Sequence, residues 1–598
     1  MYSKHKDALP EETIARIQGI LGELGMEPTV SIMHNGSGIY SAHMEDKLHG
    51  WHVNGKGTTQ AYCLASAYGE AMERLQAYHF YGRTADGQAD GADAFRFSPD
   101  EKPFETARCR EAYPEIYRSL RMAYALDQGI AAEAVSEEKL DGFLCRYFSD
   151  TTVTLPYYSV WEEKVVHLPE LMISALCGSN GLCAGNTPCE ALNQGIAEIL
   201  ERHVKELIFR HGYTPPEIPR EYIREHIPSL YETMLSVEAS GPYTIVVKDA
   251  SLGQGMPVAC ALFVDRAHQR YHAKFGSSFS LSVAIERCLT ELFQGFDLKK
   301  ARYHEHFMTP WSVEQSAKWN DPANRRMQLR TDMGSVPVSF ISGTPSWTFK
   351  DWETVEGYGH AGMDNQSALS FMLSKLRAFH PQAYIRDYSF LGFPAYRIFV
   401  PGVSDIRMPI GPKRVYYRIC QEDVEKLYRV PAVQLSREEL SRCYQYLTAQ
   451  DNIYRDSFGT APLAAVQAVF HLVYGEAEKA ISALSALNET AASKRYACAL
   501  MELELAQMNI EPKERDKTLA LFFEKKEAEY ARRAFRREAG KDKDVHLIDR
   551  VIDPAGKKLF AQGGGADPGA RAKLHAAMRA KLRENCPDQG RLAQVFRS

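Results

Sequence analysis

Apolar and polar positions follow two different patterns along the chain, and the change between them divides the sequence. Over residues 1–420, amphipathic helical segments are separated by short apolar runs typical of β-strands, such as Thr244–Lys248 and Tyr396–Val400. Over residues 421–540 the helical period continues, and Ala, Leu and Glu predominate. The pattern therefore predicts a mixed α/β (α+β) domain followed by an all-α region.

The C-terminal part of the chain adds two weaker signals. Residues 474–480, Tyr-Gly-Glu-Ala-Glu-Lys-Ala, resemble the turn of a helix-pair (TPR-like) repeat, although plain helical packing explains them equally well. Residues 541–598 contain consecutive glycines from Gly563, a following Asp-Pro-Gly and many Lys and Arg residues. We expect this segment to be a basic flexible tail with a short helix.

Length and charge set the outer limits. A chain of 598 residues has room for two or more domains with buried cores. Its formal net charge of -5 gives no electrostatic reason to expect direct binding of nucleic acid or of a membrane surface. Apolar runs stay well short of the ~20 residues that span a bilayer, and Met1–Lys6 lacks the apolar segment of a signal peptide. We expect a cytoplasmic protein.

The sequence repeats one arrangement of glycine, threonine and acidic residues. Residues 179–190 read Ser-Asn-Gly-Leu-Cys-Ala-Gly-Asn-Thr-Pro-Cys-Glu and lead into Glu-x-x-Glu-Arg, and residues 54–74 carry the same arrangement. A weaker third copy runs from Ser280 through Glu291 to Gln294, which stands at the position of the second glutamate. We interpret the copies as three related loop–helix units around one site. The first two units align Gly57, Thr59, Glu70, Glu73 and Arg74 with Gly185, Thr187, Glu198, Glu201 and Arg202, without a gap.

The glycine loops can bind phosphate, because glycine lets backbone amides approach a ligand and a helix start presents partial positive charge. Neither loop fits the Walker pattern, so the loops alone are weak evidence. Thr187, Pro188 and Glu190 also have a structural explanation as helix cap, first helical residue and partner in a capping box. The same helix nevertheless places Glu190, Glu198 and Glu201 on one face.

Apolar residues on this helix predict that it is buried. Ile196, Ile199, Leu200 and Val204 interleave with its acids. Buried carboxylates need compensating charge, and Mg²⁺ supplies it, since this ion prefers a few carboxylates together with phosphate oxygens. The acids therefore point to a magnesium–nucleotide site.

An alternative interpretation is that the Glu-x-x-x-Arg spacing in each copy forms an ordinary surface ion pair. Two copies in register, with Arg287 and Glu291 on a third helix, favour the magnesium–nucleotide site over that alternative. Lys6 and Lys56 could add contacts to phosphate, or they could be ordinary surface lysines.

Twelve cysteines are scattered mostly singly within apolar segments, which is typical of reduced thiols in a core. Cys177, Cys183 and Cys189 recur at regular spacing around the second glycine loop, which raises the possibility of a metal site. Zinc ligands are usually closer in sequence, so we favour a structural role for the three thiols.

Several motifs together resemble the YcaO family, and the resemblance covers roughly the first two thirds of the chain. The length and the helical extension are more similar to the stand-alone member that gives the family its name than to the peptide-modifying cyclodehydratases. The matching motifs are Asn54-Gly-Lys-Gly-x-Thr59, Gly-Glu70-x-x-Glu-Arg74, Ser179 to Ala191, Glu198-x-x-Glu-Arg202, Asp249–Gly253, Glu286-Arg-x-x-x-Glu291 and Val400–Asp405.

The resemblance implies an ATP-utilising enzyme in which glutamates hold Mg²⁺ against the phosphates. Characterised relatives phosphorylate a backbone amide oxygen, which opens the carbonyl carbon to attack by a nucleophile. The metal ligands implied are Glu70, Glu73, Glu190, Glu198, Glu201 and Glu291. The nucleotide contacts implied are Lys6, Thr13, Lys56, Glu70, Cys183, Asn186, Glu190, Arg202, Arg287 and Glu291.

Two features depart from the family pattern. Azole-forming members end in Pro-x-Pro-x-Pro, whereas the last residues here are Gln594–Ser598 without that motif, so we do not expect azoline formation. Cys183 stands where the family's name-giving member has serine, which puts in doubt a phosphate contact through a hydroxyl.

Three hypotheses for function follow. The first, implied by the resemblance, is an ATP- and Mg²⁺-dependent accessory factor for a radical methylthiotransferase that modifies an aspartate of a small-subunit ribosomal protein. The second is amide activation for thioamide formation on another protein. The third is a nucleotide-sensing scaffold without catalysis. We also expect a homodimer, because the helical region has apolar periodicity and because the resemblance implies one.

Overall fold

The computed structural model divides the chain by internal contacts into two compact units, residues 1–410 with 567–598, and residues 411–566. In the second unit the described structure includes helix α21 (Pro512–Ala520). The predicted TPR-like region over 421–540 lies mostly outside the described residues. Those residues are 5–34, 38–77, 95–294, 309–310, 336, 340–341, 343–406, 410–411, 442, 479, 482, 510–521 and 568–597.

The described part of the first unit contains three antiparallel sheets. The three-stranded sheet has the order β1 (Thr29–His34), β2 (Tyr40–Asp46), β3 (Trp51–Gly57). The four-stranded sheet has the order β11 (Thr309–Pro310), β10 (Arg270–Ser277), β9 (Val258–Asp265), β8 (Tyr243–Asp249). The six-stranded sheet has the order β4 (Lys102–Glu105), β5 (Thr151–Ser159), β12 (Tyr384–Asp387), β13 (Ala395–Phe399), β7 (Leu182–Ala184), with β6 (Lys164–Pro169) also paired to β5.

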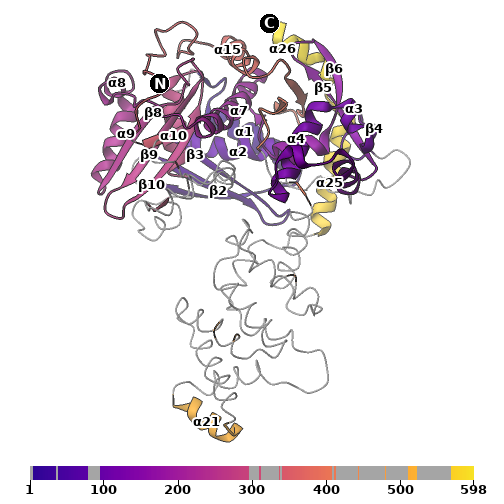
Figure 1. Cartoon of the computed structure of the whole chain (residues 1–598), viewed down its shortest axis with the longest axis horizontal. Coiled ribbons are helices and arrows are strands. Elements are labelled where there is room, and N and C mark those ends of the chain that lie inside the picture. The colour runs from indigo at the N-terminus through magenta and orange to yellow at the C-terminus, as the bar shows by residue number, and fades with distance from the viewer. Residues whose placement is uncertain are drawn as a thin grey trace. The chain divides into compact units, whose positions relative to one another are not determined.

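Helices pack against these sheets, so the unit is a mixture of helices and sheets, as predicted (Figure 1). The α-helices are α1 (Pro10–Glu23), α2 (Gln60–Gln76), α3 (Cys109–Ala112), α4 (Pro114–Gln128), α5 (Glu137–Phe148), α6 (Glu170–Cys177), α7 (Pro188–His211), α8 (Arg220–His226), α9 (Pro228–Ala239), α10 (Leu281–Leu292), α15 (Asn365–Arg377), α25 (Pro568–Glu584) and α26 (Leu592–Arg597). Short 3₁₀ turns lie at Thr106–Arg108, Ala132–Ala134 and Gln589–Arg591.

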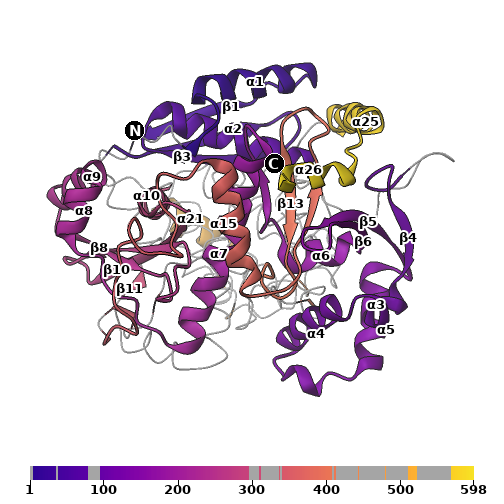
Figure 2. The same cartoon turned by 90° about the horizontal axis from the view of Figure 1, so that it is seen from above.

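Helix α7 lies at the centre of the unit beside α15 (Figure 2). Its residues Ile196, Ile199, Leu200 and Val204 are completely buried, which confirms the prediction of a buried helix. Both apolar runs predicted to be strands are also confirmed, as β8 and β13. Among the described residues, no helix is both long and apolar enough to cross a membrane.

The end of the chain departs from the flexible tail predicted for residues 541–598. Helix α25 places Leu574, Met578 and Leu582 in the core formed by α1, α2 and the three-stranded sheet. Lys581 pairs with Glu23 of α1 at 2.7 Å. The short helix α26 follows and packs against the core around α7. The predicted helix is therefore present, but residues 568–597 pack against the first unit, because an apolar stripe with helical spacing lies among many basic residues.

Candidate functional site

Each of the three predicted loop–helix units is a strand followed by a short turn and a helix: β3–α2, β7–α7 and β10–α10. Thr59 caps α2, where its hydroxyl accepts a hydrogen bond from the Tyr62 amide at 3.2 Å. Thr187 caps α7 in the same way, with the Glu190 amide as donor at 3.3 Å. The Thr187 cap is therefore confirmed, and so is Pro188 as the first helical residue.

The glycines of these loops have a packing role that does not depend on a ligand. A Cβ added at Gly57 would lie 2.6 Å from the amide nitrogen of Cys63, and one at Gly185 would lie 2.7 Å from that of Ala191. Both contacts are closer than any side chain allows, so the helix can fold back on its strand here only beside glycine. This packing brings the carboxylates of the following helix close to the strand and its loop.

Acidic side chains from all three helices gather beside these loops. On α2, Arg74 contacts Glu70 and Glu73 through different guanidinium nitrogens, both at 3.3 Å. On α7, Arg202 contacts Glu198 at 2.8 Å. The Glu-x-x-x-Arg pairs of the alternative interpretation therefore exist, but they do not account for the burial of Glu73.

Glu73 is the clearest sign of a charged cluster inside the protein. Burial raises the pKa of its carboxyl to about 8, with the negative charges of Glu198 and Glu70 adding to the rise and Arg74 and Arg397 opposing it. The acids of α2 and α7 are therefore close enough to repel one another. A buried group of like charges is costly unless cations enter it.

Cations line the other side of the cluster. Lys56 of β3 forms an ion pair with Glu291 of α10. Burial lowers the pKa of Lys56, which the charge of Glu201 opposes. Burial also lowers the pKa of Arg287, and Glu201 again opposes the change. The structure thus brings these four predicted residues, together with Glu70, Glu73, Glu198 and Arg202, into one region.

The donor set of this region fits Mg²⁺. Its acidic side chains are all carboxylates, whose oxygens this ion prefers, and the raised pKa of Glu73 means that its carboxylate form needs a nearby cation to be stable at neutral pH. Among the described residues, no group of three or more His, Cys, Asp or Glu side chains is arranged to hold a metal ion on its own. Magnesium does not need such a cage, because it commonly takes one or two carboxylates and completes its shell with phosphate oxygens and water.

A second group of predicted residues lies at the N-terminal end of α7. Glu190 is buried, and its carboxylate accepts hydrogen bonds from Lys6 at 3.1 Å and from Asn186 at 3.1 and 3.2 Å. The Thr13 hydroxyl donates to the Asn186 side-chain oxygen at 2.8 Å. The Glu190 carboxylate thus turns to Lys6 and Asn186, whereas the capping box would direct it to the N-terminal backbone of its own helix.

Glu190 lies apart from the other acids of its helix. Eight residues separate it from Glu198, which corresponds to about 12 Å along an α-helix. Sharing a helix face therefore does not bring Glu190 to the same point as Glu198. Its contacts instead connect it to Lys6 and Asn186.

Cys183 corrects one prediction. Its side chain is completely buried, its thiol donates to the carbonyl oxygen of Tyr396 at 3.6 Å, and it packs against Gly195 of α7. The thiol faces the interface between strand and helix, which favours a packing role over a nucleotide contact. Cys177 contacts Ser404 and Cys189 contacts Gln366, and these separate surroundings support the structural interpretation of all three thiols.

Several residues of the region were missed in the sequence. Asp7 donates its amide to Glu190 at 2.9 Å, and Arg16 donates to the backbone oxygen of Asn186 at 3.3 Å. Gln194 of α7 accepts a hydrogen bond from Arg287. Of these residues, only Gln194 could have been predicted from the sequence, because it lies on the same apolar helix as the predicted acids.

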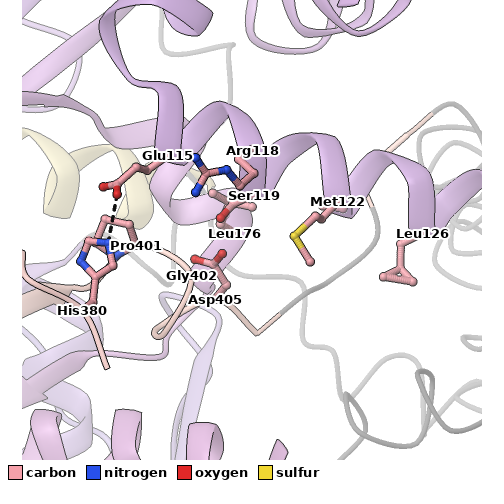
Figure 3. A pocket seen from close by; sticks show the side chains of 11 residues that line it. Glu115, Arg118, Ser119, Met122, Leu126, Leu176, His380, Pro401, Gly402 and Asp405 are labelled. Carbon is pink, nitrogen blue, oxygen red and sulfur yellow. Dashed lines mark hydrogen bonds and ion pairs between the residues drawn. The ribbon is translucent and has the colours of Figure 1, made fainter. Parts of the chain in front are cut away.

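A separate pocket of about 120 Å³ lies between α4, α6 and the loop at 401–405 (Figure 3). Glu115 and His380 form a hydrogen bond at 3.0 Å along its wall, and Leu176 and Pro401 add apolar surface. None of its lining residues belongs to the predicted site. This pocket is therefore separate from the cluster of carboxylates on α2, α7 and α10.

Comparison with known proteins decides the family. The model described as "YcaO cyclodehydratase, ATP- and Mg²⁺-binding" matches residues 54–404. The chain belongs to the YcaO family. The match confirms ATP and Mg²⁺ as the predicted cofactors.

Two curated relatives extend the comparison. The chain is 31% identical over 407 residues to an uncharacterized protein of Haemophilus influenzae, covering 67% of this chain and 66% of that protein. It is 30% identical over 408 residues to the ribosomal protein S12 methylthiotransferase accessory factor YcaO of Escherichia coli, with the same coverage. The match therefore spans slightly less than two thirds of each relative.

The solved structures that the chain resembles are more distant. A heterocyclase in complex with substrate and cofactor gives a TM-score of 0.46 at 17% identity, covering 68% of this chain and 54% of that chain. YcaO from Methanopyrus kandleri, bound with AMPPCP and Mg²⁺, gives a TM-score of 0.36 at 15% identity, covering 67% and 92%. Because both TM-scores are below 0.5, the family assignment rests on the sequence matches alone.

Proposed function

We propose that the chain binds ATP with Mg²⁺ between α2, α7 and α10 and uses it to assist a modification of another protein. The observation that carries this proposal is the partly buried cluster of acids around Glu73, in which Arg74 contacts Glu70 and Glu73 and Lys56 contacts Glu291. Structural ion pairs alone would not need a carboxylate whose pKa is raised to about 8.

The two groups of residues suggest a division of the nucleotide. Glu70, Glu73, Glu198, Glu201 and Glu291 would hold magnesium, which when bound offsets the charge on the transferring phosphoryl group. Lys56, Arg202 and Arg287 would contact phosphate oxygens. Lys6, Thr13, Asn186 and Glu190 would contact the nucleoside end. Of the two predicted roles of Glu190, we therefore keep the nucleotide contact and drop the metal ligand.

The finer function that we propose is that of an accessory factor for a radical methylthiotransferase acting on a ribosomal protein. The printed name of the Escherichia coli relative supports this proposal. An alternative is ATP-dependent activation of a backbone amide for thioamide formation, which would need a sulfur donor. The family match supports ATP use in both cases.

The binding test adds AMPPCP with Mg²⁺ and measures binding by isothermal titration calorimetry and by thermal unfolding. A ligand at about a hundred times its dissociation constant stabilises a protein by ~2.7 kcal/mol, so wild type should melt at a clearly higher temperature. Glu201→Gln should lose most of this increase. The matched control is Glu137→Gln, which changes an exposed ion-paired acid far along the chain. An unchanged melting temperature in wild type would refute the site.

The cellular test compares the intact mass of ribosomal protein S12 in a deletion strain carrying wild type, Glu201→Gln or an empty vector. Loss of a methylthio increment without the gene, and restoration by wild type alone, would support the accessory factor. Restoration by a Glu201→Gln protein that cannot hydrolyse ATP would favour a non-catalytic scaffold. Unchanged masses in all strains would contradict the methylthiolation proposal and direct attention to amide activation.

A further inference from the structure

The segment before α1 lies across the N-terminal ends of two helices. Lys6 forms an ion pair with Glu190 of α7. The next residue, Asp7, forms three hydrogen bonds, one through its amide and one through each carboxylate oxygen. One Asp7 carboxylate oxygen accepts a hydrogen bond from the Thr187 hydroxyl, and the other accepts one from the Asn365 side-chain amide at 2.9 Å. The Asp7 amide completes the set by donating to Glu190 at 2.9 Å.

The attachment continues into the protein. Asn365 is the first residue of α15 and is buried. Its backbone oxygen and its side-chain oxygen accept hydrogen bonds from the Asn193 side chain of α7, at 2.9 and 3.4 Å. Asp7 is therefore linked through Asn365 to the central helix. Its negative charge also lies at the helix starts of α7 and α15, where anions are favoured.

A lysine alone would not hold this position well. The Lys6 side chain is 42% exposed, whereas Glu190 is 4% exposed, so Lys6 approaches a buried carboxylate from the solvent side. A lysine side chain has many rotamers, and residues ahead of a first helix are poorly ordered unless they are tied down. The hydrogen bonds of Asp7 fix the backbone of the segment next to Lys6. The His5 ring adds an edge contact with Phe279, just before the start of α10.

We infer that Asp7 is a positioning residue for nucleotide binding. Asp7 acts through Lys6 and Glu190 and does not itself touch the ligand. The inference rests on the proposed function, because it assigns Lys6 and Glu190 to the nucleoside end. Asp7→Asn is the informative change. Both Asp7 oxygens accept hydrogen bonds, and an asparagine must turn its NH₂ group toward one of the two donors.

The expected effect is a change in affinity with little change in turnover. In titrations with AMPPCP and Mg²⁺, Asp7→Asn should raise Kd by about tenfold, the loss expected for one charge-assisted hydrogen bond. The kcat of ATP hydrolysis should stay within about twofold of wild type. Glu11→Gln, which changes an exposed acid in the first turn of α1, is the control and should bind as wild type does.

A double-mutant cycle tests whether Asp7 acts through Lys6. In a Lys6→Met background, Asp7→Asn should weaken binding by less than about twofold, because the side chain that it positions has gone. An effect of equal size in both backgrounds would overturn the inference. Wild-type affinity in Asp7→Asn, or a loss confined to kcat, would overturn it too.

Hydrogen exchange in the nucleotide-free protein separates this inference from the proposed function. Amides of residues 5–9 should exchange faster in Asp7→Asn than in wild type, while those of α7 should be unchanged. If wild type fails to bind AMPPCP with Mg²⁺, the proposed function and the nucleotide role of Asp7 both fall. If wild type binds but the exchange of residues 5–9 does not respond to the substitution, only the Asp7 inference falls.

Discussion

Replacing Glu73 by Gln should affect the protein in opposite directions with and without its ligand. Burial raises the pKa of Glu73 from 4.5 to about 8 in the folded, metal-free chain. The folded state therefore binds this proton more tightly than the unfolded state does. The stabilising contribution is fully present below the unfolded pKa and is lost as the pH rises through the folded pKa.

The magnitude follows from these two pKa values. One pKa unit corresponds to ~1.4 kcal/mol, so between about pH 5.5 and about pH 8.5 the folded wild type should lose at most ~3 kcal/mol relative to a variant without this carboxyl. Relaxation around the site and the loss of the contact with Arg74 reduce the difference. We expect about 1–3 kcal/mol.

Urea denaturation in the presence of a chelator, at both pH values, measures the difference between wild type and Glu73→Gln. Other titrating groups are common to the two proteins, so the change in their difference isolates Glu73. Glu137→Gln, at an exposed ion pair, should show no such change. Thermal unfolding with AMPPCP and Mg²⁺ should then show the opposite order, with wild type stabilised and Glu73→Gln not. A difference that does not vary with pH, or a full ligand response in Glu73→Gln, would refute the reasoning.

Three further substitutions probe separate features. Gly185→Ala should destabilise the protein by about 1–3 kcal/mol in urea, because its Cβ would lie 2.7 Å from a backbone nitrogen; unchanged stability would mean that the turn can move. Met578→Ala, at a completely buried position of α25, should cost ~2–5 kcal/mol in the same assay; a flexible tail would show no loss. Cys183→Ser should leave the Kd for AMPPCP with Mg²⁺ within about twofold, because the thiol is buried against Tyr396; a tenfold change would place this side chain at the nucleotide.

Local signals predicted the parts of the site that lie on single elements. The order Thr-Pro-x-Glu gave the start of α7 because each of these residues suits one position of a helix start. The apolar spacing of α7 gave its burial, and the register of the first two motifs gave four of the acids. These inferences needed no knowledge of distant contacts.

Contacts between distant segments could not be predicted in this way. Asp7 meets Thr187 and Asn365, and nothing in the local sequence of Asp7 specifies either partner. Glu190 and Glu198 share a helix face, but the rise of the helix separates them along its axis. Only the tertiary contact with Lys6 shows which residues surround the Glu190 carboxylate. Homodimerisation stays a prediction; a monomeric mass in light scattering at micromolar concentration would count against it.

The packing of α25 and α26 against the first unit has a consequence for how the protein is made. Residues 411–566 form an insertion between two parts of one folding unit. A ribosome adding ~5–20 residues per second needs on the order of ten to thirty seconds to pass through such an insertion. During that time the surface of α1 and α2 that later covers Leu574 and Met578 faces water. We therefore expect newly made chains to pass through a stage in which this apolar surface of α1 and α2 is not yet covered by α25.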